Sequence, residues 1–413
     1  MDLLVMPVPF FDKNMAVSAY FMLYQEENAL LRANQTEREH DSAAISPLLV
    51  TLGKVGIDAF TMGLPIFVPV GGLTLLANLA GQCKVPPEKV VFVLGEDVLP
   101  EQPYIGKVQE LKKLGFKFAM RGIKRVDTYA PLAKECEYIC FSHKSAHNIQ
   151  QQLMNALVRR DFKNLKIVMN DIQSQADYED LKGQGVAMFE GRFYRLPITK
   201  DAEHNVSPLK VNLIKLLDLV RDEKFEFADV AKVIQQDTAL TISLMRLINS
   251  PFIGLRQKVT SINQAVTILG QVEVSKWVTT AVSKLLGADR PDELTRLSLV
   301  RARLAENLAA RFSLGDKAES LFLLGLFSVL DIILEMPMEE ALSMVQVSDE
   351  IREALLEGKG EFGEILKFIL QYEAGDFTAV SRTLIVRDIQ PLDIYNAYTD
   401  ALAWYRSVIG PGD

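Results

Sequence analysis

Cysteine and histidine are scarce in this chain of 413 residues, which has 3 cysteines and 4 histidines. An odd and low number of cysteines does not indicate a disulfide framework, and it fits a reducing compartment. Cys136, Cys140, His143 and His147 form a C-x3-C-x2-H-x3-H pattern. A zinc finger needs about a dozen residues between its two ligand pairs. We therefore expect buried cysteines, surface histidines, and no bound metal or other cofactor.

Motifs for nucleotide binding and nucleophilic catalysis are also missing. The sequence contains neither G-x-x-x-x-G-K-[S/T] nor G-x-G-x-x-G, and no Ser or Cys stands in the signature of an activated nucleophile. Gly71 and Gly72 precede an expected helix and could cradle a phosphate at its N-terminus. A tight turn between a strand and a helix explains the glycine pair equally well.

The second half of the chain has fewer positively charged than negatively charged residues. Residues 1–200 hold 23 Lys and Arg against 22 Asp and Glu, whereas residues 201–413 hold 22 against 31. The resulting net charge of −9 in the second half repels phosphate backbones. We therefore expect no nucleic-acid partner.

Long uncharged stretches are rare as well. One runs between Asp58 and Lys84, long enough for the roughly 20 residues of a membrane span. Two prolines and a glycine pair interrupt it, which favours a buried strand and helix. The N-terminal residues MDLLVMPVPFF lack the basic start and long apolar core of a signal peptide. A cytoplasmic protein without a membrane span is expected.

Strands and helices alternate through the first two hundred residues. A strand hairpin is expected near residues 6–23, with its turn at 12–14. Further strands are expected at 66–70, 90–94, 116–119, 138–141 and 166–169. Helices are expected at 44–55, 73–79, 105–114, 148–159 and 176–183. This alternation predicts an α/β fold with a parallel sheet covered by helices on both faces. The number of units suits a barrel, either complete or shortened.

Several phrases in this half resemble the EAL domain. They are the opening P-x-F-D-x-N-x-x-x-x-A-Y-x-x-L-Y of residues 9–24 and the later VVFVLGEDVLP, LKKLGFKFAM and YEDLKGQGVAMFEGRFYRLP. EAL domains are barrels that hydrolyse the bacterial second messenger cyclic di-GMP at a two-metal site, formed at the C-terminal ends of the barrel strands. The resemblance implies an EAL-like (β/α) barrel for residues 1–199.

The catalytic residues that this resemblance implies are replaced. The places of the naming motif, the metal ligands and the substrate contact are held by Phe21, Gln25, Pro69, Val93, Arg121, Gly122, Cys140, Ser142, Asn170, Gln173 and Glu190. Two-metal hydrolysis needs several carboxylates to neutralise the cations and acidify the bridging water. The replacements remove most of that charge, and Arg121 puts a cation where a metal ion would sit. We expect no catalytic residue and no phosphodiesterase activity.

Residues 237–270 organise the second half. Asp237 is expected to cap a helix whose apolar face is formed by Leu240, Leu244, Leu247 and Ile248. A second helix opens at Ser261, with Gln264 in a capping box, and closes at Gly270. The elements D-x-A-L, R-L-x-N-S, aromatic-x-G and A-x-x-x-L-G in this order resemble the HDOD domain. That family is a helical output module related to metal-dependent HD phosphohydrolases.

The remaining second half is expected to be helical. The polar residues 200–207 are expected to be a linker, which leaves residues 208–413 for the HDOD domain and a C-terminal helical extension. Other helices are expected at 209–220, 227–235, 274–286, 291–311, 320–336, 362–373, 377–386 and 389–408. Trp277 and the aromatic residues of the tail are expected to pack in the core.

The HD dipeptide of the hydrolases falls on Ser328 and Val329, so the resemblance implies a second degenerate site. Asp331 remains as a lone carboxylate, suited to capping or to pairing with an arginine. The phrases GLFSVLDIILEMPMEEAL and IREALLEGKGEFG further resemble the C-terminal part of fused EAL–HDOD signalling proteins.

These resemblances imply a non-enzymatic bacterial signal-transduction protein. It would bind other signalling proteins in pathways linked to cyclic di-GMP, such as motility and biofilm formation. Phe252, Arg256 and Lys258, in the loop between the two helices of residues 237–270, are the candidate interaction surface. The alternative is a cyclic di-GMP receptor that binds without hydrolysis, with Arg121 as a phosphate partner. Assembly into homo-oligomers is left open.

Overall fold

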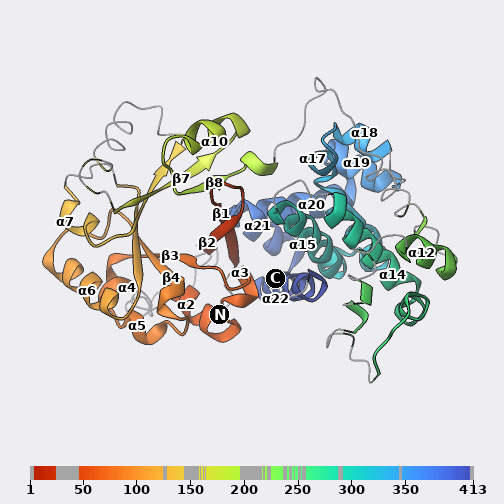
Figure 1. Ribbon diagram of the computed structural model, residues 1–413, viewed down its shortest axis with the longest axis horizontal. Helices are drawn as coiled ribbons and strands as arrows, with labels where there is room; N and C mark the ends of the chain where they lie inside the picture. Colours follow the sequence, from red (N-terminus) through yellow and green to blue (C-terminus); the bar gives the residue numbers. More distant parts are fainter. Residues whose placement is uncertain are drawn as a thin grey trace. The chain divides into compact units, whose positions relative to one another are not determined.

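The computed structural model describes residues 4–24, 46–123, 128–143, 164–195, 225–235, 257–286, 292–343 and 347–409, with residues 158, 160, 162, 216, 219, 220, 240, 244, 245, 247–249 and 253 between them. The chain forms two compact units (Figure 1). The first consists of residues 1–194 and 372–395, and the second of residues 195–371 and 396–413. Each unit has its own buried apolar core.

A closed barrel of eight strands forms the centre of the first unit. The strands are β1 (Val5–Phe11), β2 (Val17–Tyr24), β3 (Ile66–Val70), β4 (Val90–Leu94), β5 (Lys117–Arg121), β6 (Tyr138–Ser142), β7 (Lys166–Ile172) and β8 (Met188–Gly191). Strand β1 is antiparallel to β2 and β8, and the other neighbours are parallel. The predicted barrel is confirmed as a complete one. The sequence pattern missed β8, because its 4 residues carry too little periodicity.

Alternate side chains of these strands point inward and fill the barrel. The buried inner cluster is apolar and consists of Phe10, Ala19, Phe21, Phe67, Val91, Val93, Ala119, Tyr138, Cys140 and Val168. The ring of Phe67 lies 4.9 Å from that of Phe10 and 5.1 Å from that of Tyr138, both in edge contacts. The interior is therefore a packed core and not a channel.

Short helices connect the strands. They are α2 (Pro47–Val55), α3 (Asp58–Thr61), α4 (Gly72–Leu76), α5 (Leu79–Gln82), α6 (Gln102–Lys113), α7 (Ala130–Ala133) and α10 (Gln175–Lys182). The helix predicted at residues 73–79 is wrong in extent: α4 ends at Leu76, and Asn78 caps the separate helix α5 by accepting a hydrogen bond from the Gly81 N–H. Within the described residues, no helix has the length and apolar character needed to cross a membrane.

The barrel closes where β1 meets β8, and this junction is narrow because its register contains the single pair Phe11–Phe189. Tyr178 of α10 adds a connection there. Its hydroxyl donates a hydrogen bond to the Lys13 carbonyl at 3.0 Å, in the turn between β1 and β2. Its ring stacks on Phe193 with 4.8 Å between the centroids. Helix α10 thus secures the closing strands.

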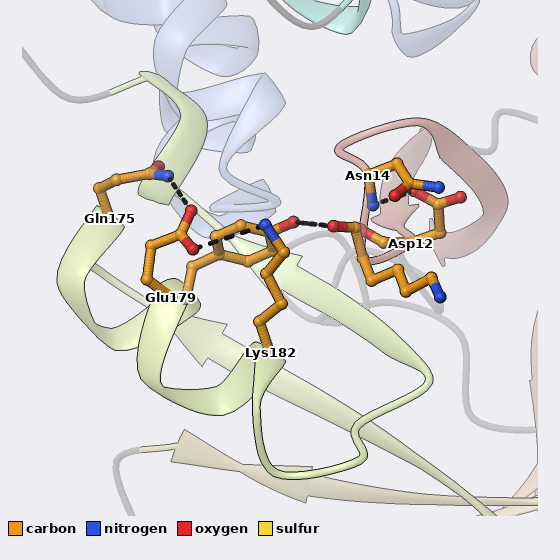
Figure 2. Close-up of polar contacts among 7 residues, drawn as sticks. Asp12, Asn14, Gln175, Glu179 and Lys182 are labelled. Atoms are coloured by element: carbon orange, nitrogen blue, oxygen red, sulfur yellow. Dashed lines mark hydrogen bonds and ion pairs between the residues drawn. The ribbon is translucent and has the colours of Figure 1, made fainter.

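The turn itself is fixed by Asp12, whose Oδ1 accepts hydrogen bonds from the backbone N–H groups of Asn14 and Ala16. Figure 2 shows the labelled side chains of α10 beside this turn. Glu179 accepts from Gln175 and pairs with Lys182 on this helix. These contacts lie on the helix surface and add little stability.

Residues 372–395 belong to the first unit, although the sequence pattern placed them in the C-terminal helical extension. The Tyr372 hydroxyl donates a hydrogen bond of 2.7 Å to the Val5 carbonyl of β1. A Cβ at Gly375, which has φ +70°, would lie 2.8 Å from Leu23 Cδ1 of β2. Asp376 then caps α21 (Phe377–Arg387). The predicted linker, residues 200–207, lies outside the described residues.

The second unit is helical. Its helices are α12 (Phe227–Gln235), α14 (Ile262–Leu286), α15 (Asp292–Leu308), α16 (Ala318–Phe327), α17 (Leu330–Leu334), α18 (Met338–Ser343), α19 (Asp349–Glu357) and most of α20 (Gly360–Glu373) and α22 (Pro391–Ile409). Helix α15 is buried along most of its length. Trp277, Tyr398, Trp404 and Tyr405 are buried, which confirms their predicted place in the core, and Tyr395 is half-buried.

The single buried helix predicted at residues 320–336 is wrong, because α16 and α17 are separate helices that break at Ser328 and Val329. The Ser328 hydroxyl donates to the Gly325 carbonyl at 2.6 Å and so competes with the helical backbone bond. Close packing surrounds the break. A Cβ at Gly325 would lie 2.5 Å from the Arg301 carbonyl oxygen of α15, so only glycine fits there.

The stretch of residues 237–270 follows its prediction in most respects. Its described apolar face is buried and consists of Leu240, Leu244, Leu247 and Ile248. Ser261 Oγ accepts the Gln264 N–H at the start of α14, as expected for a capping residue. Gly270 has a positive φ of 76°, but the chain kinks there and α14 continues to Leu286. The apolar face beyond Gly270, including Trp277, is buried in the core, and this burial favours continuation of the helix past the glycine.

Candidate functional site

The C-terminal ends of the barrel strands gather the positions that the sequence singled out. Phe21, Pro69, Val93, Arg121, Cys140, Ser142, Asn170 and Glu190 lie on β2 to β8, and Gly122 and Gln173 directly follow β5 and β7. The register pairs Pro69 with Val93, Arg121 with Cys140, and Ser142 with Asn170. This end of a parallel barrel is where active sites form. Gln25 lies outside the described residues.

One side of this site is apolar. Phe21, Val93 and Cys140 are buried and belong to the packed barrel interior. None of the three has a carboxylate or carbonyl side-chain oxygen, which are the ligands that Mg²⁺ and Ca²⁺ take. The three side chains therefore extend the apolar core of the barrel and provide no ligands for a metal ion.

Arg121 lies on top of this apolar side. Its guanidinium carbon is 4.7 Å from the centre of the Phe21 ring, which is a cation–π contact. Burial raises the pKa of the Cys140 thiol to about 12, and the nearby charges of Arg121 and Glu190 act on that pKa in opposite directions. A fixed cation therefore stands among these residues, and it disfavours a metal ion at the same place.

The other side is polar and is centred on Asp171, which the sequence analysis missed. Its Oδ2 accepts a 2.6 Å hydrogen bond from Ser142 Oγ, and its backbone N–H donates to Glu190 Oε2 at 3.1 Å. The Gln173 amide donates to the Asp171 carbonyl. Asp171 has φ +63°, a conformation that Asp tolerates better than most residues. The Asn-Asp pair at residues 170–171 was the available signal in the sequence.

Asp171 and Glu190 are the described carboxylates on this polar side, and both already accept hydrogen bonds. The Oδ1 of Asn170 is buried without a hydrogen-bond partner in the described part of the structure. Among the described residues, no three His, Cys, Asp or Glu side chains come together as metal ligands. The described residues at this mouth do not fit the two-metal centre that the EAL resemblance implies.

The Gly71–Gly72 pair meets a carboxylate of the chain itself. Asp97 Oδ2 accepts a 2.7 Å hydrogen bond from the Gly72 N–H, and a Cβ at Gly71 would lie 3.3 Å from the same oxygen. A phosphate at this N–H would have to displace an anion that is already bonded there. The glycines are explained by this close approach of the Asp97 loop.

The Cys–His pattern is not brought together as a zinc site. Burial raises the pKa of the Cys136 and Cys140 thiols to about 12, so both are protonated at neutral pH and are poor metal ligands. His143 was predicted to be at the surface, but its side chain is 12% exposed, with Nε2 3.3 Å from Asp177 Oδ1. The packing of α10 over the end of β6 explains this. His147 lies outside the described residues.

Ser328 and Val329, the two positions that the sequence aligned with the HD dipeptide, lie at the break between α16 and α17. Ser328 Oγ accepts a 3.0 Å hydrogen bond from Arg301 Nη1 of α15, and Val329 is buried. Burial raises the pKa of the Asp331 carboxyl, while backbone hydrogen bonds, including one from Ile332, and the Arg301 charge lower it. Val329 and not Asp331 holds the N-cap position of α17, and no side chain caps this helix, so the predicted capping role of Asp331 is wrong; the Arg301 charge acts on its pKa. Arg301 was missed because α15 carries three arginines, Arg296, Arg301 and Arg303, and the sequence does not tell which of them reaches Ser328.

Comparison with known proteins agrees with this arrangement. Residues 207–364 match the HDOD domain. The chain is an EAL-like barrel followed by a helical region that contains an HDOD domain.

Two proteins are similar over most of the chain. The uncharacterized protein YuxH of Bacillus subtilis (strain 168) is 24% identical over 407 residues, 97% of each chain. The cyclic di-GMP phosphodiesterase CdgJ of Vibrio cholerae serotype O1 is 24% identical over 331 residues, 78% of this chain and 75% of CdgJ. A distant relation to cyclic di-GMP phosphodiesterases follows.

Solved structures match about half of the chain. Klebsiella pneumoniae BlrP1, in a complex with calcium and cyclic di-GMP, has a TM-score of 0.38 and 13% identity, covering 48% of this chain and 56% of BlrP1. The Xanthomonas citri FimX EAL domain, in complex with cyclic di-GMP, has a TM-score of 0.36 and 15% identity, covering 47% and 87%. This chain therefore spans little more than half the length of BlrP1.

Within the HDOD domain, Asn249 fixes the base of the predicted interaction loop. Its Nδ2 donates to the Met245 and Val259 carbonyls at 2.9 Å each, and its Oδ1 accepts the Val259 N–H at 2.9 Å. Val259 is buried, and Lys258 beside it is exposed. Phe252 and Arg256, the other two residues of the predicted surface, lie outside the described residues.

Proposed function

We propose that this protein transmits a signal without catalysis, by binding other proteins in a pathway linked to cyclic di-GMP. The observation that carries the proposal is the Arg121 guanidinium on the Phe21 ring, 4.7 Å away, at the mouth of a barrel whose neighbouring positions are packed with apolar side chains. The similarity to CdgJ, a cyclic di-GMP phosphodiesterase by name, supports the link to this nucleotide.

The chemistry of hydrolysis argues for a non-enzymatic role. A two-metal mechanism needs a cluster of carboxylates that neutralises two cations and lowers the pKa of a bridging water. Asp171 and Glu190 are both engaged in hydrogen bonds with neighbouring residues of the chain, and Arg121 supplies positive charge at the same mouth. In the HDOD domain, Arg301 also supplies positive charge, by donating a hydrogen bond to Ser328.

A protein partner is the remaining class of target. Lys258 is exposed and lies next to the Asn249 clamp, which supports Lys258 as part of a contact surface for other signalling proteins. By resemblance to fused EAL–HDOD proteins, the response would concern motility or biofilm formation.

The receptor alternative has no observation in its favour. Its proposed phosphate cradle at Gly72 is occupied by Asp97, and its proposed phosphate partner Arg121 is stacked on Phe21. Calorimetry with cyclic di-GMP at micromolar concentration checks this, and we expect no heat of binding.

The test of the main proposal is an assay of the full chain with cyclic di-GMP and Mg²⁺ or Mn²⁺, beside an active EAL phosphodiesterase as positive control. We expect no linear dinucleotide from this protein under conditions in which the control turns over. Hydrolysis at ordinary enzyme rates, about 1 s⁻¹ or faster, would refute it.

A further inference from the structure

The first residues of β1 and the last residues of β2 form one side of the barrel mouth. Strand β2 is parallel to β3, with Phe21 opposite Phe67, so β2 ends at the C-terminal mouth. Strand β1 runs the other way and pairs Val5 with Tyr24, so β1 begins at the same mouth. Leu23, two residues after Phe21, packs against the inner cluster. Val5 and Leu23 therefore mark the side of the mouth that carries the Phe21 ring.

The turn between α20 and α21 lies on this side of the mouth, and we call its residues 372–376 the cap. The Tyr372 hydroxyl donates a 2.7 Å hydrogen bond to the Val5 carbonyl, and Tyr372 is fully buried. A Cβ at Gly375 would lie 2.8 Å from Leu23 Cδ1, so the backbone of the cap lies directly against that side chain. The cap thus contacts both strands where they reach the mouth.

The local structure of the cap suits a close backbone contact. The Gly375 N–H donates a 3.0 Å hydrogen bond to the Tyr372 carbonyl and closes the turn. Gly375 has φ +70°, a conformation that glycine adopts without strain. Asp376 Oδ1 then accepts the Ala379 N–H and starts α21. Any larger residue at Gly375 would strain the turn and push against Leu23, so the contact depends on the glycine.

We propose that the cap is an autoinhibitory contact, which closes one side of the barrel mouth so that a protein partner reaches Phe21 and Leu23 only after the cap has moved. This inference rests on the proposed protein-binding function and adds a means of controlling it. Helix α20 starts at Gly360, inside the HDOD match of residues 207–364, and ends at Glu373 in the cap. A partner that shifts α20 therefore moves the cap through the chain itself.

The test is the labelling of native cysteines by iodoacetamide in the folded full chain, counted by mass spectrometry. Cys140 belongs to the inner cluster near the mouth, whereas Cys136 precedes β6 at the other end of the barrel and serves as an internal control. The opening variants are Gly375→Ala and Tyr372→Phe. The matched control is Gly185→Ala, because Gly185 has a similar φ of +74° but nothing lies within 4 Å of an added Cβ.

Both opening variants should label Cys140 about tenfold faster than the wild type, as expected when a buried hydrogen bond or a close contact that holds a local structure is lost. Cys136 should keep its wild-type rate, and Gly185→Ala should match the wild type at both cysteines. An unchanged Cys140 rate in either opening variant would overturn the proposal. An equal rise at Cys136 would also overturn it, because the whole barrel would then be unfolding. The hydrolysis assay does not involve the cap, so the two proposals fail separately.

Discussion

The substitution Gly325→Ala tests how closely α15 and α16 pack in the helical unit. The added Cβ would lie 2.5 Å from the Arg301 carbonyl oxygen and 2.6 Å from Ala302 Cα, and both are backbone atoms that no side-chain rotation can move. Reaching ordinary contact requires the helices to separate by roughly 1 Å. The same movement stretches the 2.7 Å hydrogen bond from Ser298 Oγ to the Leu326 carbonyl.

The size of the effect follows from three contributions. Overpacking costs about 1–3 kcal/mol, and a weakened buried hydrogen bond costs about 1 kcal/mol more. The better helix propensity of alanine offsets about 1 kcal/mol. We therefore expect Gly325→Ala to lower the free energy of unfolding by about 1–3 kcal/mol. Gly106 of α6 is the matched control: a Cβ there meets nothing within 4 Å, so Gly106→Ala should stabilise by about 0.5–1 kcal/mol.

The assay is urea unfolding followed by tryptophan fluorescence. The chain has two tryptophans, Trp277 and Trp404, and both are buried in the helical unit. Fluorescence therefore reports on the unit that contains Gly325. The midpoint should fall in Gly325→Ala and stay unchanged in Gly106→Ala, because Gly106 lies in the unit that contains no tryptophan. An unchanged or higher midpoint in Gly325→Ala would show that the two helices are not packed backbone to backbone.

Three further predictions concern buried polar groups. Burial raises the pKa of Asp331 above its ordinary value, so the folded state holds this proton more tightly than the unfolded chain, and the stability that the proton contributes is lost as the pH rises through the folded pKa. Asp331→Asn should therefore flatten the fall in urea midpoint from about pH 4 upward and raise the midpoint at pH 7; an unchanged pH slope would contradict this. The pKa of the Cys136 and Cys140 thiols is raised to about 12, so iodoacetamide at pH 8 should leave them unlabelled in the folded protein and label them in urea, as counted by mass spectrometry; rapid labelling without urea would argue against their burial. Tyr372→Phe removes the 2.7 Å hydrogen bond to the Val5 carbonyl and should cost about 1–3 kcal/mol and speed amide exchange in β1 and β2; unchanged exchange there would separate residues 372–395 from the barrel.

Local patterns in the sequence determined the elements of this protein well. Runs of apolar residues bounded by Pro or Gly predicted the bounds of β3, β4 and β6 closely. A buried strand can be predicted in this way because its pattern lies in consecutive residues. The Ser261 cap and the positive φ of Gly270 were also readable, since each depends on one residue and its immediate neighbours. The replaced positions at the barrel mouth followed from aligning motifs, and the strand register then placed them at one end of the barrel.

The tertiary structure alone decided which distant residues contact one another. Asp97 reaches Gly72 across 25 residues, Arg301 reaches Ser328 across 27, and Tyr372 reaches Val5 across 367. No local periodicity encodes such pairs, because they depend on how separate elements pack and on which buried polar group needs a partner. The sequence by itself predicted that the positions aligned with the two sites hold residue types other than metal ligands. Only the fold decided that Arg121 lies on Phe21, that the Asp171 carboxylate is bonded to Ser142, and that Arg301 reaches Ser328.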